Sequence, residues 1–188
     1  MYEELKNSTV MIAGATGLVG QALVRRLLSL ETKVLAVVRS IEKAKDLFGK
    51  NDRIEYWVSD VTELEVKAYD VDYIIHAASN TSSKAFINDP LGIINTAIEG
   101  TRRTLEIARL SGVKGYVFLS TMEVYGTPTT DEKVDELHST NLNTMAPRSA
   151  YPESKRMCES LCTSYASQHG IPAKVVRLTQ TFRSEEHT

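Results

Sequence analysis

A glycine-rich turn between a strand pattern and a helix pattern constrains the fold of this chain more than any other feature. The apolar run Thr9–Ala13 leads into Gly14-Ala-Thr-Gly-Leu-Val-Gly20, and a helical pattern follows over Leu18–Leu30. The first glycine permits a tight turn, the second lets the backbone approach a pyrophosphate, and the third packs the helix on the sheet. The spacing predicts a dinucleotide site, with an ordinary strand-to-helix corner as the alternative. The residues expected to contact the dinucleotide here are Gly14, Thr16, Gly17, Leu18, Val19 and Gly20.

Beyond this turn, short apolar runs alternate with helical patterns, which predicts a parallel sheet with helices on both faces. The expected strands are Thr9–Ala13, Lys33–Val38, Ile54–Val58, Val71–His76, Gly115–Leu119 and a sixth that follows Gly170-Ile-Pro172. The expected helices are Leu18–Leu30, one around Glu42–Phe48, one from Pro90 or Leu91 to about Ser111, and one from Tyr151 to about Gln168. The polar stretch Thr127–Arg148 predicts a long loop on the substrate side. We therefore expect an α/β fold with a Rossmann-type, doubly wound parallel sheet.

Composition narrows the class of protein. The 188 residues suit one domain, and a formal net charge of −2 predicts neither a nucleic-acid partner nor a membrane surface. No apolar run is long enough for a membrane span, and the first residues lack the pattern of a signal peptide. The cysteines, Cys158 and Cys162, lie one helical turn apart, which suits a buried face better than a disulfide or a zinc site. We expect a cytoplasmic protein without a bound metal.

The last six residues, Arg183–Thr188, read as a non-native tail. They resemble the translation of a sequencing-adapter oligonucleotide, and they interrupt the strand-to-loop pattern over Val175–Phe182. A short native polar tail is the alternative. The expectation is thus a cofactor-binding domain over residues 1–182, followed by a non-native tail over 183–188, from a native protein that is longer.

Four residues in the second half of the chain predict catalysis. Tyr151 and Lys155 share one face of a predicted helix, where the ammonium can lower the pKa of the phenol. Thr121, just after a strand, can reach the same substrate oxygen. Tyr151 would take a hydroxyl proton while hydride leaves the same carbon for a nicotinamide, Lys155 would hold the cofactor ribose, and Thr121 would steady the developing charge. Glu123 should project towards the same mouth, as a second acid or base or as a solvated glutamate.

The ends of the second and third strands carry the remaining cofactor predictions. Arg39 stands about twenty residues after the turn, where an acidic residue binds a ribose 2′-hydroxyl and an arginine accommodates a 2′-phosphate. Arg39 therefore favours NADP over NAD, with a surface arginine at the strand end as the alternative. Asp60 and Val61 can meet the adenine edge, although Asp60 also suits a simple cap ahead of Thr62.

Further motifs complete a family pattern. They are Asp60-Val61, His76-Ala-Ala78, Asn95 with Gly100-Thr101, Ser120-Thr-Met-Glu-Val-Tyr-Gly126, Tyr151-x-x-x-Lys155 and Arg177-Leu-Thr-Gln-Thr-Phe182. With the glycine turn, they make residues 8–182 resemble the extended short-chain dehydrogenase/reductases, specifically the NAD-dependent epimerase/dehydratase group that acts on nucleotide sugars. The resemblance implies that Ala77, Ala78 and Asn95 also contact NAD or NADP, and that a nucleotide sugar is the substrate.

The resemblance further implies transient oxidation of a sugar carbon, usually C4, followed by epimerisation, dehydration or decarboxylation. Met122 departs from the acid that 4,6-dehydratases carry there, which disfavours dehydration. The Thr-x-Glu pattern and Pro147-Arg-Ser-Ala-Tyr151 are similar to UDP-glucuronate decarboxylases. Arg39 departs from the acidic residue of those enzymes, and Gln180 stands where many members have asparagine. Epimerase and decarboxylase therefore both stay open.

Family members also carry a smaller C-terminal substrate domain, which this chain is expected to lack for the most part. They commonly dimerise through helices corresponding to about 91–111 and 150–168, and Leu161, Cys162 and Tyr165 suit either that interface or the core. Two rival functions remain: an NADPH-dependent carbonyl reductase, which Arg39 favours, and a non-catalytic cofactor-binding module.

Overall fold

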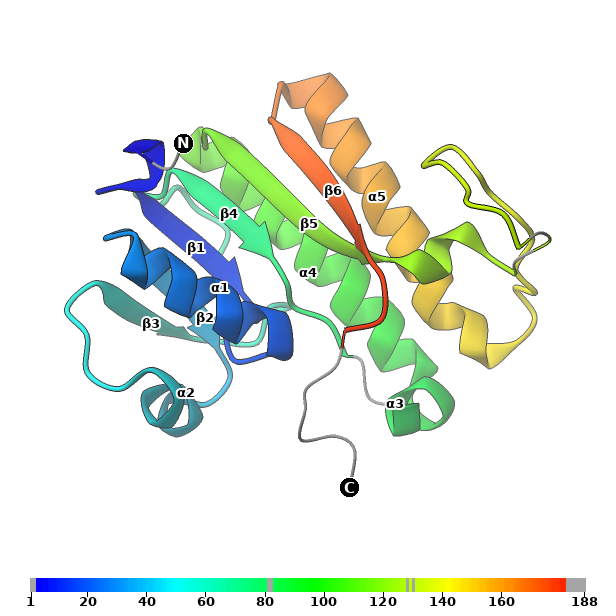
Figure 1. The fold of residues 1–188 in the computed structure, drawn as a ribbon, viewed down its shortest axis with the longest axis horizontal. Coiled ribbons are helices and arrows are strands. Elements are labelled where there is room, and N and C mark those ends of the chain that lie inside the picture. Colours follow the sequence, from blue (N-terminus) through cyan, green and yellow to red (C-terminus); the bar gives the residue numbers. More distant parts are fainter. Residues whose placement is uncertain (1–2, 81–82, 128, 130, 182–188) are drawn as a thin grey trace.

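The computed structural model describes residues 3–80, 83–127, 129 and 131–181, so the expected tail at 183–188 lies outside the described residues. Six parallel strands form one sheet in the order β3-β2-β1-β4-β5-β6, which confirms the predicted doubly wound fold (Figure 1). The strands are β1 (Thr9–Ala13), β2 (Lys33–Val38), β3 (Ile54–Val58), β4 (Tyr73–His76), β5 (Gly115–Thr121) and β6 (Ala173–Leu178). The α-helices are α1 (Leu18–Ser29), α2 (Ile41–Phe48), α3 (Ser83–Asn88), α4 (Pro90–Ser111) and α5 (Ala150–His169). Short 3₁₀ helices are η1 (Glu3–Leu5), η2 (Met122–Tyr125) and η3 (Pro147–Ser149).

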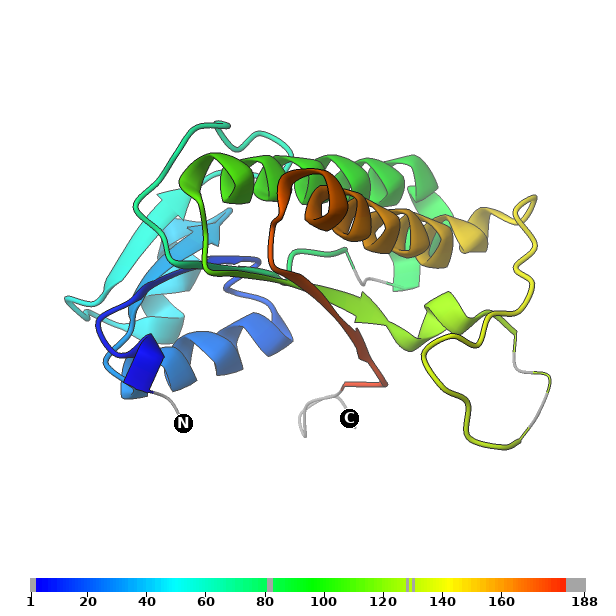
Figure 2. The same cartoon turned by 90° about the horizontal axis from the view of Figure 1, so that it is seen from above.

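The helices lie in two layers. In Figure 2, α4 and α5 cover one face of the sheet, and α1 lies on the other. Strand order reverses at β1, because the chain runs outward to β2 and β3 and then returns to β4 on the other side of β1. Connections that leave in opposite directions open a crevice at the carboxyl ends of these strands. The fold therefore fixes where a ligand site can form.

The central strand β1 is apolar throughout because both of its faces are buried. Met11 packs in the cluster under α4 and α5, while Val10 and Ile12 pack in the cluster under α1. Side chains alternate between the two faces of a strand, so a strand buried on both sides reads as a continuous apolar run. This is why the run Thr9–Ala13 could be predicted from the sequence with its bounds correct.

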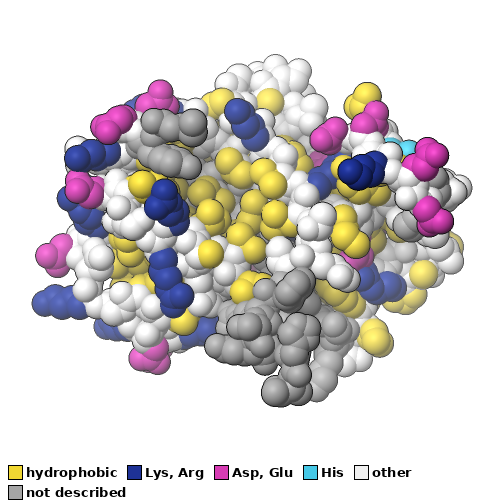
Figure 3. All heavy atoms as spheres, viewed as in Figure 1, with side chains coloured by type: hydrophobic (Ala, Val, Ile, Leu, Met, Phe, Trp, Pro, Cys, Tyr) yellow, Lys and Arg dark blue, Asp and Glu magenta, His cyan; other side chains and the backbone are white. Residues whose placement is uncertain are grey.

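One face of the sheet is only partly covered. Apolar side chains gather over β4, β5 and β6 on the side that carries α1 and α2 (Figure 3), and Val176 of β6 is 42% exposed there. On the other face, the side chains of Cys158 and Cys162 are free thiols buried in the core, and Leu161 and Tyr165 pack against them in part. Within the described ranges, no helix combines the length and apolarity needed to cross a membrane.

Among the α-helices and strands, three differ from the sequence expectations by more than a single residue at an end. Helix α3 was not predicted, since six residues are too few to show a helical period. Strand β4 begins at Tyr73 rather than Val71. Strand β5 continues through Thr121, because Ser120 and Thr121 still pair with β6. Thr121 is therefore held by the sheet itself rather than by a loop.

Candidate cofactor pocket and active site

The glycine turn is packed too tightly for side chains at two of its positions. Gly14 has a φ of 84°, and a Cβ there would lie 2.7 Å from the Cα of Ala78. A Cβ on Gly20 would lie 2.2 Å from the carbonyl oxygen of Gly14. Gly17 is the N-cap of α1 and has no side chain with which to cap the helix, so the N–H groups of the first turn stay available to an anion. This backbone cradle fits the pyrophosphate of a dinucleotide.

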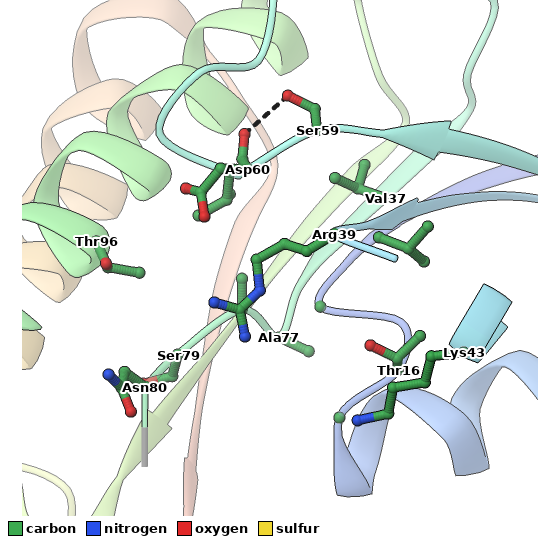
Figure 4. A pocket seen from close by; sticks show the side chains of 15 residues that line it. Thr16, Val37, Arg39, Lys43, Ser59, Asp60, Ala77, Ser79, Asn80 and Thr96 are labelled. Carbon is green, nitrogen blue, oxygen red and sulfur yellow. Dashed lines mark hydrogen bonds between the residues drawn. The ribbon is translucent and has the colours of Figure 1, made fainter. Parts of the chain in front are cut away.

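A cavity of about 550 Å³ lies at the crevice beside the turn (Figure 4). The predicted cofactor residues that line it are Gly14, Thr16, Gly17, Arg39, Asp60, Val61, Ala77 and Ala78. They follow the carboxyl ends of β1, β2, β3 and β4, which meet here. The turn therefore borders a pocket of ligand size rather than a plain corner.

Other predicted contacts lie elsewhere. Leu18 and Val19 are half-buried in the first turn of α1, outside the lining of the pocket, and Gly20 contributes through its packing. Asn95 is exposed on α4, whereas its neighbour Thr96 lines the pocket. One position along a helix turns the side chain by about 100°, so the family motif located the helix but not the inward-facing residue.

Two cations reach the pocket from the edge at β2. Figure 4 shows the side chain of Arg39 extending into the pocket, which Lys43 of α2 also lines. Lys43 was missed in the sequence; its spacing of four residues from Arg39, just inside a helix capped by Ser40, was the available sign. The two side chains give this end of the pocket a positive charge.

Asp60 both lines the pocket and caps the following turn. Its Oδ1 accepts hydrogen bonds from the backbone N–H of Thr62 at 2.9 Å and from the Thr62 hydroxyl at 2.7 Å. The backbone hydrogen bond is the largest influence that lowers the pKa of Asp60, and the charge of Arg39 adds to it. The two interpretations of Asp60 in the sequence are thus compatible.

The predicted catalytic residues meet at the end of β5. Tyr151, in the first turn of α5, is only 8% exposed. Burial is the largest influence on its phenol and raises its pKa, and the neighbouring hydroxyls of Thr121 and Ser79 oppose that shift. Ser79 also lines the cofactor pocket, so the tyrosine borders the pocket through it.

Lys155 lies one helical turn after Tyr151 in α5, but it does not lower the pKa of the phenol as predicted. Its Nζ donates to the carbonyl oxygen of Leu119 at 2.8 Å and lies 4.6 Å from the ring centroid of Phe118. Burial lowers the pKa of Lys155 to about 8. The expectation that Lys155 lowers the pKa of Tyr151 is wrong for this structure, because the ammonium is directed to a backbone carbonyl and burial dominates at the phenol.

Glu123 lies beside Thr121 at the end of β5, and its carboxylate is paired with an arginine. Its backbone N–H donates to Thr121 Oγ1 at 3.3 Å, and its carboxylate pairs with Arg148 at 2.8 Å. The guanidinium of Arg148 stacks on the ring of Phe86 at 4.4 Å. Neither Arg148 nor Phe86 was predicted as a site residue, since no local spacing links 86, 123 and 148.

A family model described as the NAD dependent epimerase/dehydratase family matches residues 10–185. The chain belongs to this family. UDP-glucuronic acid decarboxylase 3 of Arabidopsis thaliana is 33% identical over 181 residues, which cover 94% of this chain and 52% of that relative. The chain spans about half the length of the curated relatives it matches.

Two solved structures share the fold. The UDP-N-acetylglucosamine 4-epimerase of Methanobrevibacter ruminantium, in complex with UDP-N-acetylmuramic acid, gives a TM-score of 0.79 at 20% identity, over 92% of this chain and 55% of that one. The enzyme WbmF of Bordetella bronchiseptica, in complex with NADH, gives a TM-score of 0.70 at 25% identity, over 93% of this chain and 49% of that one.

The described residues bring no three His, Cys, Asp or Glu side chains together as a metal site requires.

Proposed function

We propose that this protein is an NAD(P)-dependent oxidoreductase of nucleotide sugars, which oxidises a sugar carbon, C4 in our assignment, ahead of epimerisation or decarboxylation. One observation carries the proposal: the buried Tyr151, beside the hydroxyl of Thr121, borders the glycine-lined pocket through its neighbour Ser79. The family assignment supports it, as do relatives named UDP-glucuronic acid decarboxylases and a neighbour that binds NADH. A bound nicotinamide would supply the hydride acceptor and donor.

The residues of this chain would perform the remaining steps. The phenol of Tyr151 would remove the proton from the sugar hydroxyl, and Thr121 would hold the same oxygen by a hydrogen bond. Lys155 has a pKa of about 8 and is therefore mostly charged at neutral pH, and it would bind the ribose of the cofactor. The pyrophosphate would occupy the cradle at Gly14 and Gly17. Glu123 would move a second proton at the neighbouring sugar carbon.

Decarboxylation and epimerisation both remain within this proposal. Met122, which is 43% exposed, occupies the position at which a dehydratase would place an acid, so dehydration is disfavoured. The names of the relatives favour decarboxylation. We also propose a cytoplasmic location and a homodimer formed by α4 and α5.

The test compares the turnover of the parent protein with that of a Tyr151→Phe variant and of a control variant at another tyrosine. The full-length protein that contains this chain is incubated with NAD⁺ and either UDP-glucuronate or an uncharged UDP-hexose, and CO₂ release, hexose interconversion and net cofactor reduction are followed. Tyr151→Phe should lower turnover by about 10²–10⁴-fold, while Tyr165→Phe on the outer part of α5 should not. Cofactor binding, read from nicotinamide fluorescence, should survive Tyr151→Phe.

Other outcomes identify the rivals. Stoichiometric oxidation of NADPH by a small ketone would establish a carbonyl reductase. Binding without turnover of any of these substrates, together with no phenotype for Tyr151→Phe in cells, would establish a cofactor-binding module.

A preference for NADP is the finer part of the cofactor proposal. Arg39 and Lys43 both reach the pocket, and two cations there suit a phosphate better than a ribose hydroxyl. Replacing both with glutamine should weaken NADPH binding roughly tenfold or more and leave NADH binding almost unchanged. Lys45→Gln, an exposed position on the same helix, is the control. Equal losses for the two cofactors would reject the preference.

A further inference from the structure

Arg148 lies where three elements converge on the candidate active site. It belongs to η3, immediately before α5, and its side chain is 50% exposed. A single terminal nitrogen, Nη2, contacts both carboxylate oxygens of Glu123, at 2.9 and 2.8 Å. The guanidinium of Arg148 therefore offsets the negative charge of Glu123, and both charges act on the phenol of Tyr151.

Two aromatic rings fix the direction in which this guanidinium points. Its carbon lies 4.4 Å from the ring centroid of Phe86 and 6.0 Å from that of Tyr151. The two rings in turn pack against each other, with centroids 4.9 Å apart. A planar guanidinium prefers to lie over aromatic faces, so α3 supplies a shelf that an ammonium would not use equally well.

The charges around Tyr151 oppose one another. Glu123 raises the pKa of the phenol, and Arg148 lowers it. The ammonium nitrogen of Lys155 lies 6.0 Å from the same ring centroid and is directed to the carbonyl oxygen of Leu119. The hydroxyls of Thr121 and Ser79, which also influence the phenol, are neutral. The effect of Glu123 on the phenol thus depends on whether Arg148 stays paired with it.

We propose that Arg148, held on Phe86, is a positioning residue that keeps Glu123 paired and so shields the base Tyr151 from its charge. The assignment rests on the proposed function, in which Tyr151 acts as the base. Its physical content is nevertheless independent of turnover: the arginine acts through Glu123, and the shelf of Phe86 keeps it in place.

The test titrates one tyrosine in the folded protein. A fluorotyrosine is placed at position 151, because fluorine lowers the pKa of a phenol into a range where the protein stays folded and gives a single ¹⁹F resonance. Arg148→Met removes the charge but can still pack on Phe86, and it should move the titration upward by about one pH unit. Glu123→Gln should move it downward, and the double variant should return towards the parent.

Two more variants separate positioning from folding. Arg148→Lys keeps the charge without the planar group, and Phe86→Leu removes the shelf without touching the charge; each should give a smaller upward shift than Arg148→Met. Arg102→Met, which breaks an exposed ion pair with Glu99 on α4, should leave the titration unchanged. Urea midpoints measured in parallel identify any variant that unfolds.

The outcomes distinguish this proposal from the proposed function. If Arg148→Met titrates at the same pH as Arg102→Met, or if the double variant shifts as far as Arg148→Met alone, Arg148 does not act through Glu123 and the inference is wrong. If the shifts occur as expected but no nucleotide sugar is turned over, the positioning role stands and the proposed function fails.

Discussion

The candidate cofactor pocket and the candidate active site at the end of β5, hereafter the catalytic edge, are held in shape by different means. At the pocket, the backbone of Gly14 meets the backbone of Ala78, and Gly20 meets the carbonyl of Gly14, at distances that admit no Cβ. At the catalytic edge, the elements are joined by side chains, such as the bond from Lys155 to Leu119. Backbone contacts fail completely when an atom is added, whereas side-chain contacts can be removed one at a time. Perturbations should therefore be abrupt in the first region and graded in the second.

The largest expected effect comes from adding one methyl group at the turn. Gly14→Ala combines a left-handed φ of 84° with a contact of 2.7 Å to Ala78, and it should lower the free energy of unfolding by about 3 kcal/mol. Urea denaturation measures the loss, and nicotinamide fluorescence should show no cofactor binding.

Gly112→Ala is the matched control for that variant. Gly112 also has a left-handed φ, 62°, at the C-cap of α4, but nothing lies within 4 Å of a Cβ there. Its cost should be about 1 kcal/mol, from the backbone conformation alone. Equal costs for the two variants would mean that the close approach to Ala78 does not hold the pocket, and the comparison would break.

Acid should lower the stability of the folded chain through the buried side chain of His76. This residue is fully buried at the end of β4, hydrogen-bonded to Thr104 and Thr101, and burial lowers its pKa from 6.5 to about 3. Below pH 6.5 the unfolded chain takes up a proton that the folded chain does not, so stability falls as the pH falls. We expect a loss of about 2 kcal/mol between pH 7 and pH 5.

Urea denaturation at several pH values checks this slope. His76→Gln should remove it, because glutamine carries no proton in either state. His169→Gln, at an exposed position on α5, should retain it. A slope that survives in His76→Gln would assign the acid sensitivity to another group.

The smallest expected effect concerns the ion pair between α5 and β6. Arg177 binds both carboxylate oxygens of Glu159, at 3.0 and 2.8 Å, and its third nitrogen donates to the carbonyl of Glu136 at 2.7 Å. Ser120 donates to the same carboxylate at 2.6 Å. Arg177→Met should cost about 1.5 kcal/mol, because Glu159 is left partly buried without its partner.

A surface pair provides the scale for that variant. Arg109→Met breaks a contact with Glu106 on the exposed side of α4 and should cost at most about 0.5 kcal/mol. If Arg177→Met costs no more than Arg109→Met, side-chain pairs add little to the catalytic edge, and the contrast between the two regions would need another explanation. If Arg177→Met lost as much stability as Gly14→Ala, the catalytic edge would respond to substitution as abruptly as the pocket does.

The same contrast explains what could be predicted from the sequence. The strands and the glycine turn are encoded locally, by apolar runs and by residues without a Cβ, so their positions follow from the letters alone. Thr121 and Tyr151 were found because a family pattern joins them. The partners Ser79, Arg148 and Glu159 were not, because only the folded chain brings them near residues far away in the sequence.

The direction of the pKa shift at Tyr151 was missed for a related reason. Helical spacing places Lys155 on the same face, but it does not show that a carbonyl of β5 lies closer to the ammonium than the phenol does. Nor does spacing reveal burial, which here exceeds every local influence on the phenol. Asn95 and Thr96 illustrate the same limit, since the helix was predicted and its inward face was not.

The reversal of strand order at β1 also has a thermodynamic consequence. The pocket is built from segments as far apart in the sequence as Gly14, which follows β1, and Thr96, which lies in the helix between β4 and β5, so it joins the two halves of the sheet. A ligand that occupies it must bridge both halves, so it binds the folded chain and not the separated halves. By mass action, a dinucleotide at 100 times its dissociation constant would add about 2.7 kcal/mol to the stability of the whole sheet. Occupancy and resistance to proteolysis should therefore rise together.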